Sequence, residues 1–469
     1  MDLRFRLSAL RLRGARGSGA ERFDSVHWDT PDLRLAAWDS GLRHRRGRGW
    51  RLTLLSQAED SGVRRLDLDL PGGPEAPPPR AVQLLSGYLR GAPLQPVARV
   101  RHLETHRCAG EVRVVHQVVS RIESGRAVAR ARRLSLRNRG EADDLKRPLA
   151  ALRRAGLVPG PAPGLLAELL GPDAEPRWRP VALDPASPVV SVVSAALRDC
   201  VGRLVRNQAV LLEGSDPEGI HQARVACRRI RSDLQTFTPV LDPEWADGLR
   251  AELQPLADAL GRVRDTDVLL MRLRTSAADH GLGGPGAARL LDGLASEREE
   301  AREALVRRLD SGEHRRQLDR LIDAALAPAV LPECAEEPAV AALMPLVTAG
   351  WRKLRRRVRG LSGRPADDEL HRARILTKRC RYAVLALGPP LGEGPDETGT
   401  LLGELQDALG EQHDAVVAAE WLRRAADGET AFAAGVLYGV ERERADAGRT
   451  AWRRQWKAVD RKRVWSWVR

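Results

Sequence analysis

Two eleven-residue segments that lie 150 residues apart concentrate the side chains best suited to binding anions. The first reads His221-Gln-Ala-Arg-Val-Ala-Cys-Arg-Arg-Ile-Arg231, the second reads His371-Arg-Ala-Arg-Ile-Leu-Thr-Lys-Arg-Cys-Arg381, and neither contains an acidic residue. Guanidinium groups bind phosphate oxygens in a bidentate manner, and a nearby histidine adds hydrogen-bond donors. The two segments therefore predict that this protein binds an extended polyanion.

On an α-helix, the cationic positions of each segment fall within about 80° of arc, so they share one face. The residues of these two faces and their flanks are His221, Arg224, Arg228, Arg229 and Arg231, and His371, Arg374, Lys378, Arg379 and Arg381. The preceding helices also align, and they carry cations at Arg203, Arg206, Lys353 and Arg356. Like charges at this spacing repel one another, so their repetition in two copies indicates that a ligand offsets the repulsion.

The repeat continues downstream of both segments. Leu256–Gly261 with Asp265 recurs as Leu405–Gly410 with Asp414, and the His-to-Asp spacing is 44 in one copy and 43 in the other. Arg264 precedes Asp265, whereas His413 takes the equivalent place in the second copy. A repeat on this scale predicts a duplicated helical unit that grips its ligand from two sides.

A second interpretation of the basic faces is that they are solvated, or that their arginines pair with acids inside the bundle. Asp258, Asp265, Asp407 and Asp414 recur at matching positions and are suited to such pairing. The duplicated, acid-free pattern favours a binding surface over this interpretation. We interpret Asp265 and Asp414 as residues that orient arginines or cap helices.

The composition points to anionic partners without identifying one. The 469 residues carry a formal net charge of +14, yet only five of the 77 basic residues are lysine, so a bias toward arginine codons accounts for part of the excess. Nucleic acid, polyphosphate and an anionic membrane surface all fit this charge. The five scattered cysteines suit a reducing compartment, and no apolar run is long enough to span a bilayer. We therefore expect a cytoplasmic location.

The chain is predicted to be an α+β multidomain protein. Short alternating runs indicate strands at 2–7, 41–46, 50–56, 63–70, 98–106, 111–119 and 128–136, with helices at 79–89 and 143–155. We expect an antiparallel β-tunnel or barrel over 1–160 and a proline-rich linker over 161–187 with a short helix at 164–170. Residues 188–469 read as eight or more helices in two related halves, about 188–330 and 338–469.

Several landmarks place the helices of the second part. Ser191–Leu212 is amphipathic, and Ser215-Asp-Pro-Glu218 supplies a helix start with proline in the first turn. Gly281–Gly286 and Gly392–Gly399 are expected to break the chain between helices.

The two basic segments resemble the signature of the CHAD family of histidine-bearing α-helical domains, and the likeness covers roughly residues 188–469. The resemblance implies two pseudo-symmetric helical bundles with a basic groove that binds inorganic polyphosphate. The resemblance implies a polyphosphate-binding role for the histidines and cations of both segments. It implies the same role for Arg264, because the dipeptide Arg264-Asp265 matches the family's next helix. In the second copy His413 replaces the arginine of this dipeptide, so a symmetric contact is not implied there.

Residues 1–160 resemble the CYTH or triphosphate tunnel family through His27-Trp-Asp-Thr-Pro-Asp-Leu-Arg-Leu35, Gly41-Leu-Arg-His-Arg45 and Trp50-Arg-Leu-Thr-Leu54. The resemblance implies an antiparallel β-tunnel that acts on phosphoanhydrides with a divalent metal. The family's acidic opening is replaced by Asp2-Leu-Arg-Phe-Arg6, and its late acidic strand by Arg132-Arg-Leu-Ser-Leu-Arg137. We therefore expect a degenerate, non-catalytic tunnel with cations but no carboxylates. It is either a scaffold without ligand or a residual anion site at Arg6, Arg43 and Arg45.

Two weaker patterns receive structural explanations. His102-Leu-Glu-Thr-His106 has the wrong glutamate position for a zinc helix and is interpreted as two surface histidines on a strand. Trp452, Trp456, Trp465 and Trp467 lie among cations, as for stacking on bases, but they suit closure of the last helix better. The sequence thus favours non-enzymatic binding of inorganic polyphosphate, without a cofactor or metal and with association to polyphosphate granules. A metal-dependent triphosphatase and a nucleic-acid-binding protein are the alternatives.

Overall fold

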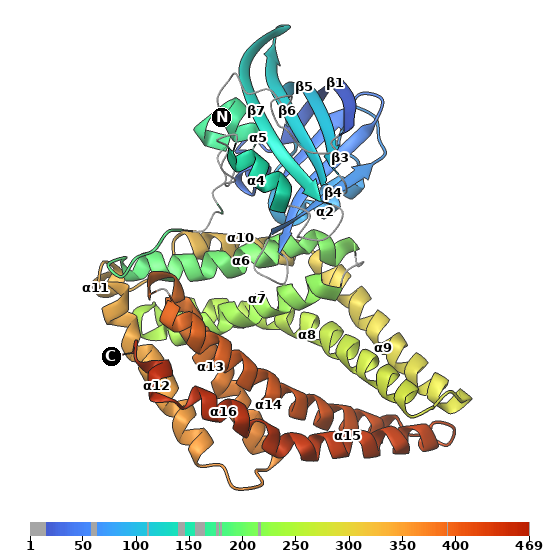
Figure 1. Cartoon of the computed structure of the whole chain (residues 1–469), viewed down its shortest axis with the longest axis vertical. Helices are drawn as coiled ribbons and strands as arrows, with labels where there is room; N and C mark the ends of the chain where they lie inside the picture. Colours follow the sequence, from blue (N-terminus) through green and yellow to red (C-terminus); the bar gives the residue numbers. More distant parts are fainter. Residues whose placement is uncertain are drawn as a thin grey trace. The chain divides into compact units, whose positions relative to one another are not determined.

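The computed structural model divides the chain into two compact units, residues 1–179 and 180–469. The structure describes residues 16–57, 63–109, 112–138, 146–154, 165–174, 178, 181–213, 217–391 and 393–468. Figure 1 shows a β-sheet in the first unit and helices throughout the second. This agrees with the predicted α+β architecture.

The first unit is built on one antiparallel sheet of seven strands in the order β4-β3-β2-β1-β5-β6-β7. The strands are β1 (Arg16–Asp29), β2 (Gly41–Arg45), β3 (Gly49–Gln57), β4 (Val63–Leu70), β5 (Gln95–Ala109), β6 (Val112–Glu123) and β7 (Arg126–Asn138). Within the described ranges no pairing joins the edge strands β4 and β7, so the sheet is open and not a closed barrel. The strand expected at 2–7 lies outside the described residues.

Short helices flank this sheet. They are α1 (Arg34–Ala37), α2 (Pro79–Leu84), α3 (Ser86–Leu89), α4 (Lys146–Arg154) and α5 (Leu165–Leu170). α5 lies within the stretch expected to be a linker, and it packs Leu166 and Leu169 against Val100 and Val119 of the sheet. Burial of these apolar side chains fixes α5 on the sheet.

The second unit contains eleven described α-helices. They are α6 (Val189–Glu213), α7 (Pro217–Thr236), α8 (Pro243–Asp279), α9 (Pro285–Leu309), α10 (Gly312–Leu326), α11 (Pro332–Ala335), α12 (Ala339–Arg359), α13 (Asp367–Leu391), α14 (Glu393–Ala425), α15 (Ala431–Ala451) and α16 (Arg453–Val459). The predicted proline in the first turn of α7 is confirmed, since the helix begins at Pro217, whereas Ser215 and Asp216 lie outside the described residues.

The helices form two halves of the same order, with α6 to α10 matched by α12 to α16. Equivalent residues meet where the halves begin: Val189 donates to the carbonyl oxygen of Glu337 at 3.0 Å, and Ala339 donates to that of Ser187 at 2.9 Å. Pro188 and Pro338 form the bridge between them, and these positions differ by the same 150 residues as His221 and His371. The reciprocal pairing is what a pseudo-two-fold axis between duplicated halves produces.

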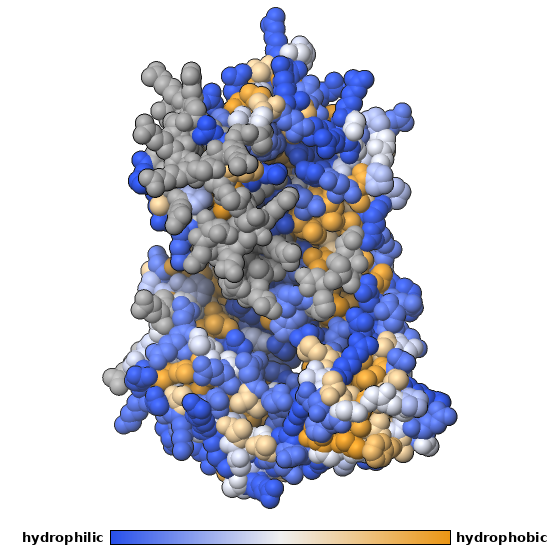
Figure 2. Space-filling view, turned by 45° about the vertical axis from the view of Figure 1, so that its right-hand side comes forward, coloured by the Kyte–Doolittle hydropathy of each residue, from blue (hydrophilic) through white to orange (hydrophobic). Residues whose placement is uncertain are grey.

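The helices bury apolar faces against their neighbours, and α8 and α9 share one apolar core with α14 and α15 of the other half. In α7, Ala223, Cys227, Ile230 and Leu234 are fully buried, while the cations lie on the other face. Among the described residues no helix is both long and apolar enough to cross a membrane. Hydrophilic side chains predominate on the face shown in Figure 2, where apolar ones form separate patches.

Candidate functional site

The two basic segments lie on α7 and α13, and these helices pack against each other between the two halves. Arg228 of α7 reaches across and donates a hydrogen bond from Nε to the hydroxyl oxygen of Tyr382 of α13 at 2.8 Å. Its guanidinium carbon lies 5.8 Å from the centre of the Tyr382 ring. The polar faces of both helices therefore open onto a shared space.

A cavity of about 280 Å³, here called the central cavity, occupies this space between α7, α8, α13 and α14. Six cationic side chains line it: Arg224, Arg228, Arg264, Arg272, Arg374 and Lys378. The two carboxylates that line it, Asp265 and Asp414, are too few to neutralise them. Two histidines, His221 and His413, complete its ionisable lining.

Arg264, Arg374 and Lys378 are cations of this cavity that lack a close partner. Within the described part of the chain, none of the three makes a hydrogen bond or an ion pair. Burial, with a smaller effect of Arg228, lowers the pKa of Arg374, although Asp414 opposes this shift. Burial and the charges of Arg374 and Arg228 lower the pKa of Lys378 to about 7. Half-buried cations without partners cost free energy, which an incoming anion would offset.

The histidines of the site are held in their neutral form. His371 and His413 face each other with their Nδ1 atoms 3.4 Å apart. Burial, followed by the charge of Arg374, lowers the pKa of His413 to about 4. Burial and Arg264 likewise lower the pKa of His221. A neutral imidazole donates one hydrogen bond, so these residues contribute donors rather than charge near pH 7.

Part of the basic surface is neutralised inside the first half, as the second interpretation of the sequence predicts. Arg224 donates to Asp265 Oδ1 at 2.8 Å, which places Asp265 in the orienting role expected for it. Arg229 pairs with Asp199 at 3.0 Å and with the fully buried Asp233 at 3.7 Å. Asp199 also pairs with Arg203 at 3.3 Å. Arg229 and Arg203 therefore stabilise the packing of α6 on α7 and do not line the cavity.

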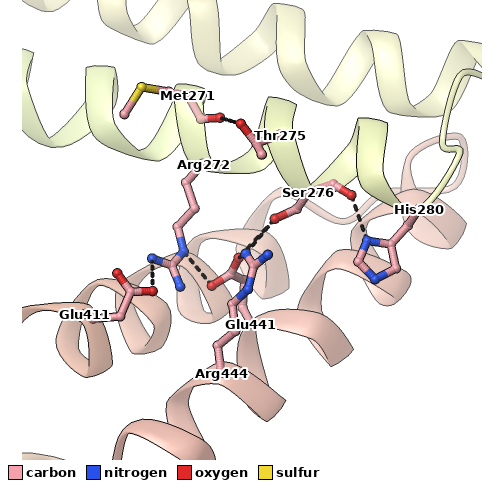
Figure 3. A network of polar contacts seen from close by, with 8 residues as sticks. All are labelled: Met271, Arg272, Thr275, Ser276, His280, Glu411, Glu441 and Arg444. Carbon is pink, nitrogen blue, oxygen red and sulfur yellow. Dashed lines mark hydrogen bonds and ion pairs between the residues drawn. The ribbon is translucent and has the colours of Figure 1, made fainter. Parts of the chain in front are cut away.

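Arg272 of α8 belongs to a buried network that joins the halves, shown in Figure 3. Its guanidinium contacts Glu411 of α14 at 2.8 Å and Glu441 of α15 at 2.6 Å. Glu441, which is fully buried, also accepts from Arg444 at 2.7 Å. Arg272 is thus a fixed part of the cavity wall whose charge is already balanced.

A second, larger cavity of about 640 Å³, here called the side cavity, lies along α7 and α8 and includes Arg231. Its counterpart Arg381 lines neither cavity, and His371 reaches the central cavity only through its contact with His413. The remaining predicted cations line neither cavity: Arg206 is half-buried, and Lys353, Arg356 and Arg379 are exposed.

The sequence did not identify three residues of the site as ligand-binding or positioning residues. Arg272 follows Arg264 by eight positions on the same helix face, so helical periodicity carried a signal for it. His413 was noted only as the replacement of an arginine, although it lines the cavity. Nothing in the spacing marked Tyr382 as the partner of Arg228.

The first unit has a cavity of about 130 Å³ lined by side chains from all seven strands, so the open sheet curls around it. Arg43 lines this cavity, and burial lowers its pKa to about 10. Arg45 lies over the Phe23 ring at 3.9 Å and pairs with Glu21. Arg6, the third predicted cation, lies outside the described residues.

The expectation of a tunnel without carboxylates is wrong for this sheet. Glu21 of β1 and Glu104 of β5 form directly opposed partners, and their oxygens lie within 4.8 Å of each other and of a His106 nitrogen. The sequence comparison considered only the family's usual acidic positions, whereas neighbouring strands supply these two. Both carboxylates have partners, since Glu21 accepts from Arg45 and Glu104 accepts from Gln117 at 2.6 Å.

The interpretation of His102 and His106 as surface histidines is also wrong for His102. Both lie on β5, as expected, but His102 is 1% exposed and contacts Ser25 at 2.8 Å through Nε2. His102 lines the cavity of the first unit. It lies on the same side of the sheet as Glu104, because side chains two residues apart on a strand point to the same face.

The C-terminal tryptophans are mostly packed inside the second half. Trp465 stacks on Trp351 with ring centroids 4.0 Å apart, and Trp452 is 3% exposed. Asp460 ties the same region to Arg355 at 2.7 Å. These contacts close α16 against α12, and they leave Trp452 and Trp465 unavailable for stacking on nucleic-acid bases.

Three comparisons relate the chain to known proteins. The family model of the CHAD domain matches residues 195–423. The uncharacterized protein Rv2226 of Mycobacterium tuberculosis is 28% identical over 475 residues, which cover 92% of this chain and 88% of that protein. Two solved structures also match in part. PptA from Streptomyces chartreusis has 26% identity and a TM-score of 0.49, over 58% of this chain and all of that one. The CHAD domain from the plant Ricinus communis has 24% identity and a TM-score of 0.48, over 62% and 94%.

Proposed function

We propose that the CHAD domain, which residues 195–423 form, binds inorganic polyphosphate in the central cavity without chemical conversion. The observation that carries this proposal is the pair Arg374 and Lys378, two half-buried cations that line the same cavity as Arg224 and Arg228 of the other half. Their mutual repulsion costs free energy, and a polyanion would relieve it.

The chemistry of the lining favours phosphate over other anions. Five of the six cations are arginines, whose planar forks match the geometry of phosphate oxygens. Because they come from both halves, they suit several linked charges better than a single small anion. Polyphosphate supplies about one charge per phosphate residue, and the resemblance of both basic segments to the CHAD family implies the same ligand.

Internal neutralisation explains only part of the basic surface. Asp265 balances Arg224, and Glu411 with Glu441 balances Arg272. No comparable pairing within the described ranges accounts for Arg264, Arg374 or Lys378. These three, with Arg228, are therefore proposed as the main phosphate contacts, and His221 and His413 as added donors.

The test is titration of the whole protein with polyphosphate of defined length at several salt concentrations. Binding should weaken steeply as salt rises, because displaced counterions drive it. The double variant Arg374→Ala/Lys378→Ala should lose most of the affinity. The matched control Arg454→Ala/Lys457→Ala removes the same two charge types from exposed positions of α16 and should bind like wild type. Equal losses in both variants, or no binding by wild type, would reject the proposal.

Nucleic acid is the competing ligand, and competition separates the two. Duplex DNA and single-stranded RNA at equal phosphate concentration should fail to displace bound polyphosphate at physiological salt. Efficient displacement would instead favour the nucleic-acid alternative. A polyphosphate ligand also leads us to expect the protein at cytoplasmic polyphosphate granules.

A further inference from the structure

The central cavity and the side cavity adjoin along one wall. They share Arg224, Arg228 and Asp265, so these side chains form the boundary between the two spaces. Nη1 of Arg224 donates to Asp265 Oδ1 and to the carbonyl oxygen of Gly261, each at 2.8 Å. The protein thus holds this boundary in place before any ligand arrives.

The side cavity brings cations of its own. Arg231 and Arg262 line it and do not line the central cavity. Across the described residues, Arg231 makes no hydrogen bond or ion pair, and its Nε atom is buried. Arg231 is therefore a second unpaired cation site that lies next to the first.

The equivalent position in the other half is arranged differently. The guanidinium of Arg381 lies close to Gly403 of α14, where a Cβ would be 3.2 Å from Arg381 Cζ. The counterpart of Gly403 in α8 is Gln254, whose amide donates to Asp258 at 2.6 Å. Because position 254 carries a side chain, the sequence does not repeat beside Arg231 the close approach that glycine allows Arg381.

We propose that a polyphosphate chain occupies the central cavity and continues into the side cavity along α7, in one direction only. The inference rests on the proposed function and adds a length preference to it. A short chain fills the central cavity alone, whereas a longer one also reaches Arg231 and Arg262. Contacts of the added phosphates are then intramolecular, so each strengthens binding without a further loss of translational freedom.

The experiment compares tripolyphosphate with a long polyphosphate in calorimetric titrations at one fixed salt concentration. Arg231→Gln should weaken binding of the long chain by about tenfold, the loss of one charge-assisted contact, and leave tripolyphosphate unchanged. Its matched control is Arg381→Gln, the equivalent residue of the other half, which should leave both ligands within about twofold of wild type.

The outcomes separate this inference from the proposed function. Suppose that wild type binds both ligands, and that Arg231→Gln and Arg381→Gln reduce the affinity for the long chain by the same factor. The directional path is then wrong, and polyphosphate binding stands. If wild type binds neither, both proposals fall. Should Arg231→Gln unfold, the exposed Arg262→Gln replaces it, since Arg262 lines the side cavity alone, and an unchanged long-chain affinity would then overturn the inference.

Discussion

Arg228 on α7 and Tyr382 on α13 join the two halves of the helical unit through a hydrogen bond of 2.8 Å at the edge of the central cavity. The bond aims a cation of the first half at the space that the second half also lines. The duplicated segments are therefore coupled directly, and the position of Arg228 depends on a residue outside its own repeat.

Removal of that hydroxyl should affect both stability and binding. Tyr382→Phe keeps the ring beside the guanidinium and deletes the acceptor, so we expect a loss of about 1 kcal/mol in unfolding free energy. Polyphosphate affinity should fall severalfold because Arg228 is no longer positioned. Urea unfolding and titration measure the two effects, with Tyr438→Phe on the exposed surface of α15 as control. Unchanged affinity in Tyr382→Phe would show that Arg228 needs no support.

The affinity for polyphosphate should depend on pH through Lys378. Its pKa of about 7 reflects burial and the charges of Arg374 on α13 and of Arg228 and Arg224 on α7, while Asp414 on α14 opposes them. The titratable neighbours His371 on α13 and His413 on α14 also face Lys378. An anion favours the protonated amine, so affinity is highest below pH 7 and falls as pH rises, by as much as about tenfold per unit. Burial lowers the pKa values of His221, His371 and His413, which moves their own titration toward lower pH and away from that of Lys378.

Titrations between pH 6 and 8.5 at constant ionic strength test this dependence. Long chains are used, so that the few terminal phosphates contribute little to the proton balance. In Lys378→Arg the guanidinium remains charged throughout, and the affinity should lose most of its pH dependence. A pH profile that is the same in wild type and Lys378→Arg would assign the proton to another group.

The same lysine should destabilise the protein when no ligand is present. Because its pKa is lower in the folded state than in the unfolded chain, the unfolded state binds the extra proton between about pH 7 and 10.5. Its contribution to folding therefore improves as pH rises through this window. Lys378→Met should raise the melting temperature of the ligand-free protein at pH 7. The rise should be about 2–4 °C for each kcal/mol by which the unfolding free energy increases. The control Lys457→Met changes an exposed lysine of α16 and should not alter it.

The Arg272 network offers a contrast between a buried and an exposed partner of one guanidinium. Glu441→Gln leaves Arg272 and Arg444 without their shared buried carboxylate, and we expect a loss of about 3 kcal/mol. Glu411→Gln removes a carboxylate that is 64% exposed, so its cost should stay below about 1 kcal/mol. Chemical denaturation measures both. Similar losses would mean that burial of Glu441 does not set the strength of the network.

The sequence predicted the faces of α7 and α13 because helical spacing alone determines which residues lie together. It did not separate cations that face the cavity from those with internal partners. Arg229 stands next to Arg228 in the chain, yet its partner Asp199 lies thirty positions earlier on α6, and no local spacing reports that contact. The choice between binding and pairing is made by tertiary packing.

The break expected at Gly392–Gly399 is shorter than predicted, since α13 ends at Leu391 and α14 already begins at Glu393. The reason is close packing: a Cβ at Gly394 would lie 3.0 Å from Trp467, and one at Gly399 would lie 2.9 Å from Leu385. These glycines admit neighbouring side chains within a continuous helix. β1 was missed for a different reason, since Arg16–Asp29 mixes charged and aromatic residues without a strict alternation.

The curled sheet of the first unit should release no orthophosphate from tripolyphosphate with Mg²⁺ or Mn²⁺. Glu21, Glu104 and His106 offer three ligand atoms, but the guanidinium of Arg45 already pairs with Glu21 and would repel a divalent cation there. Metal-assisted hydrolysis needs carboxylates free to hold the ion and position water. A phosphate-release assay on wild type, Glu104→Gln and the Arg374→Ala/Lys378→Ala variant decides the matter. Release that disappears in Glu104→Gln and persists in the double variant would locate a triphosphatase in the sheet and overturn the non-enzymatic proposal for this unit.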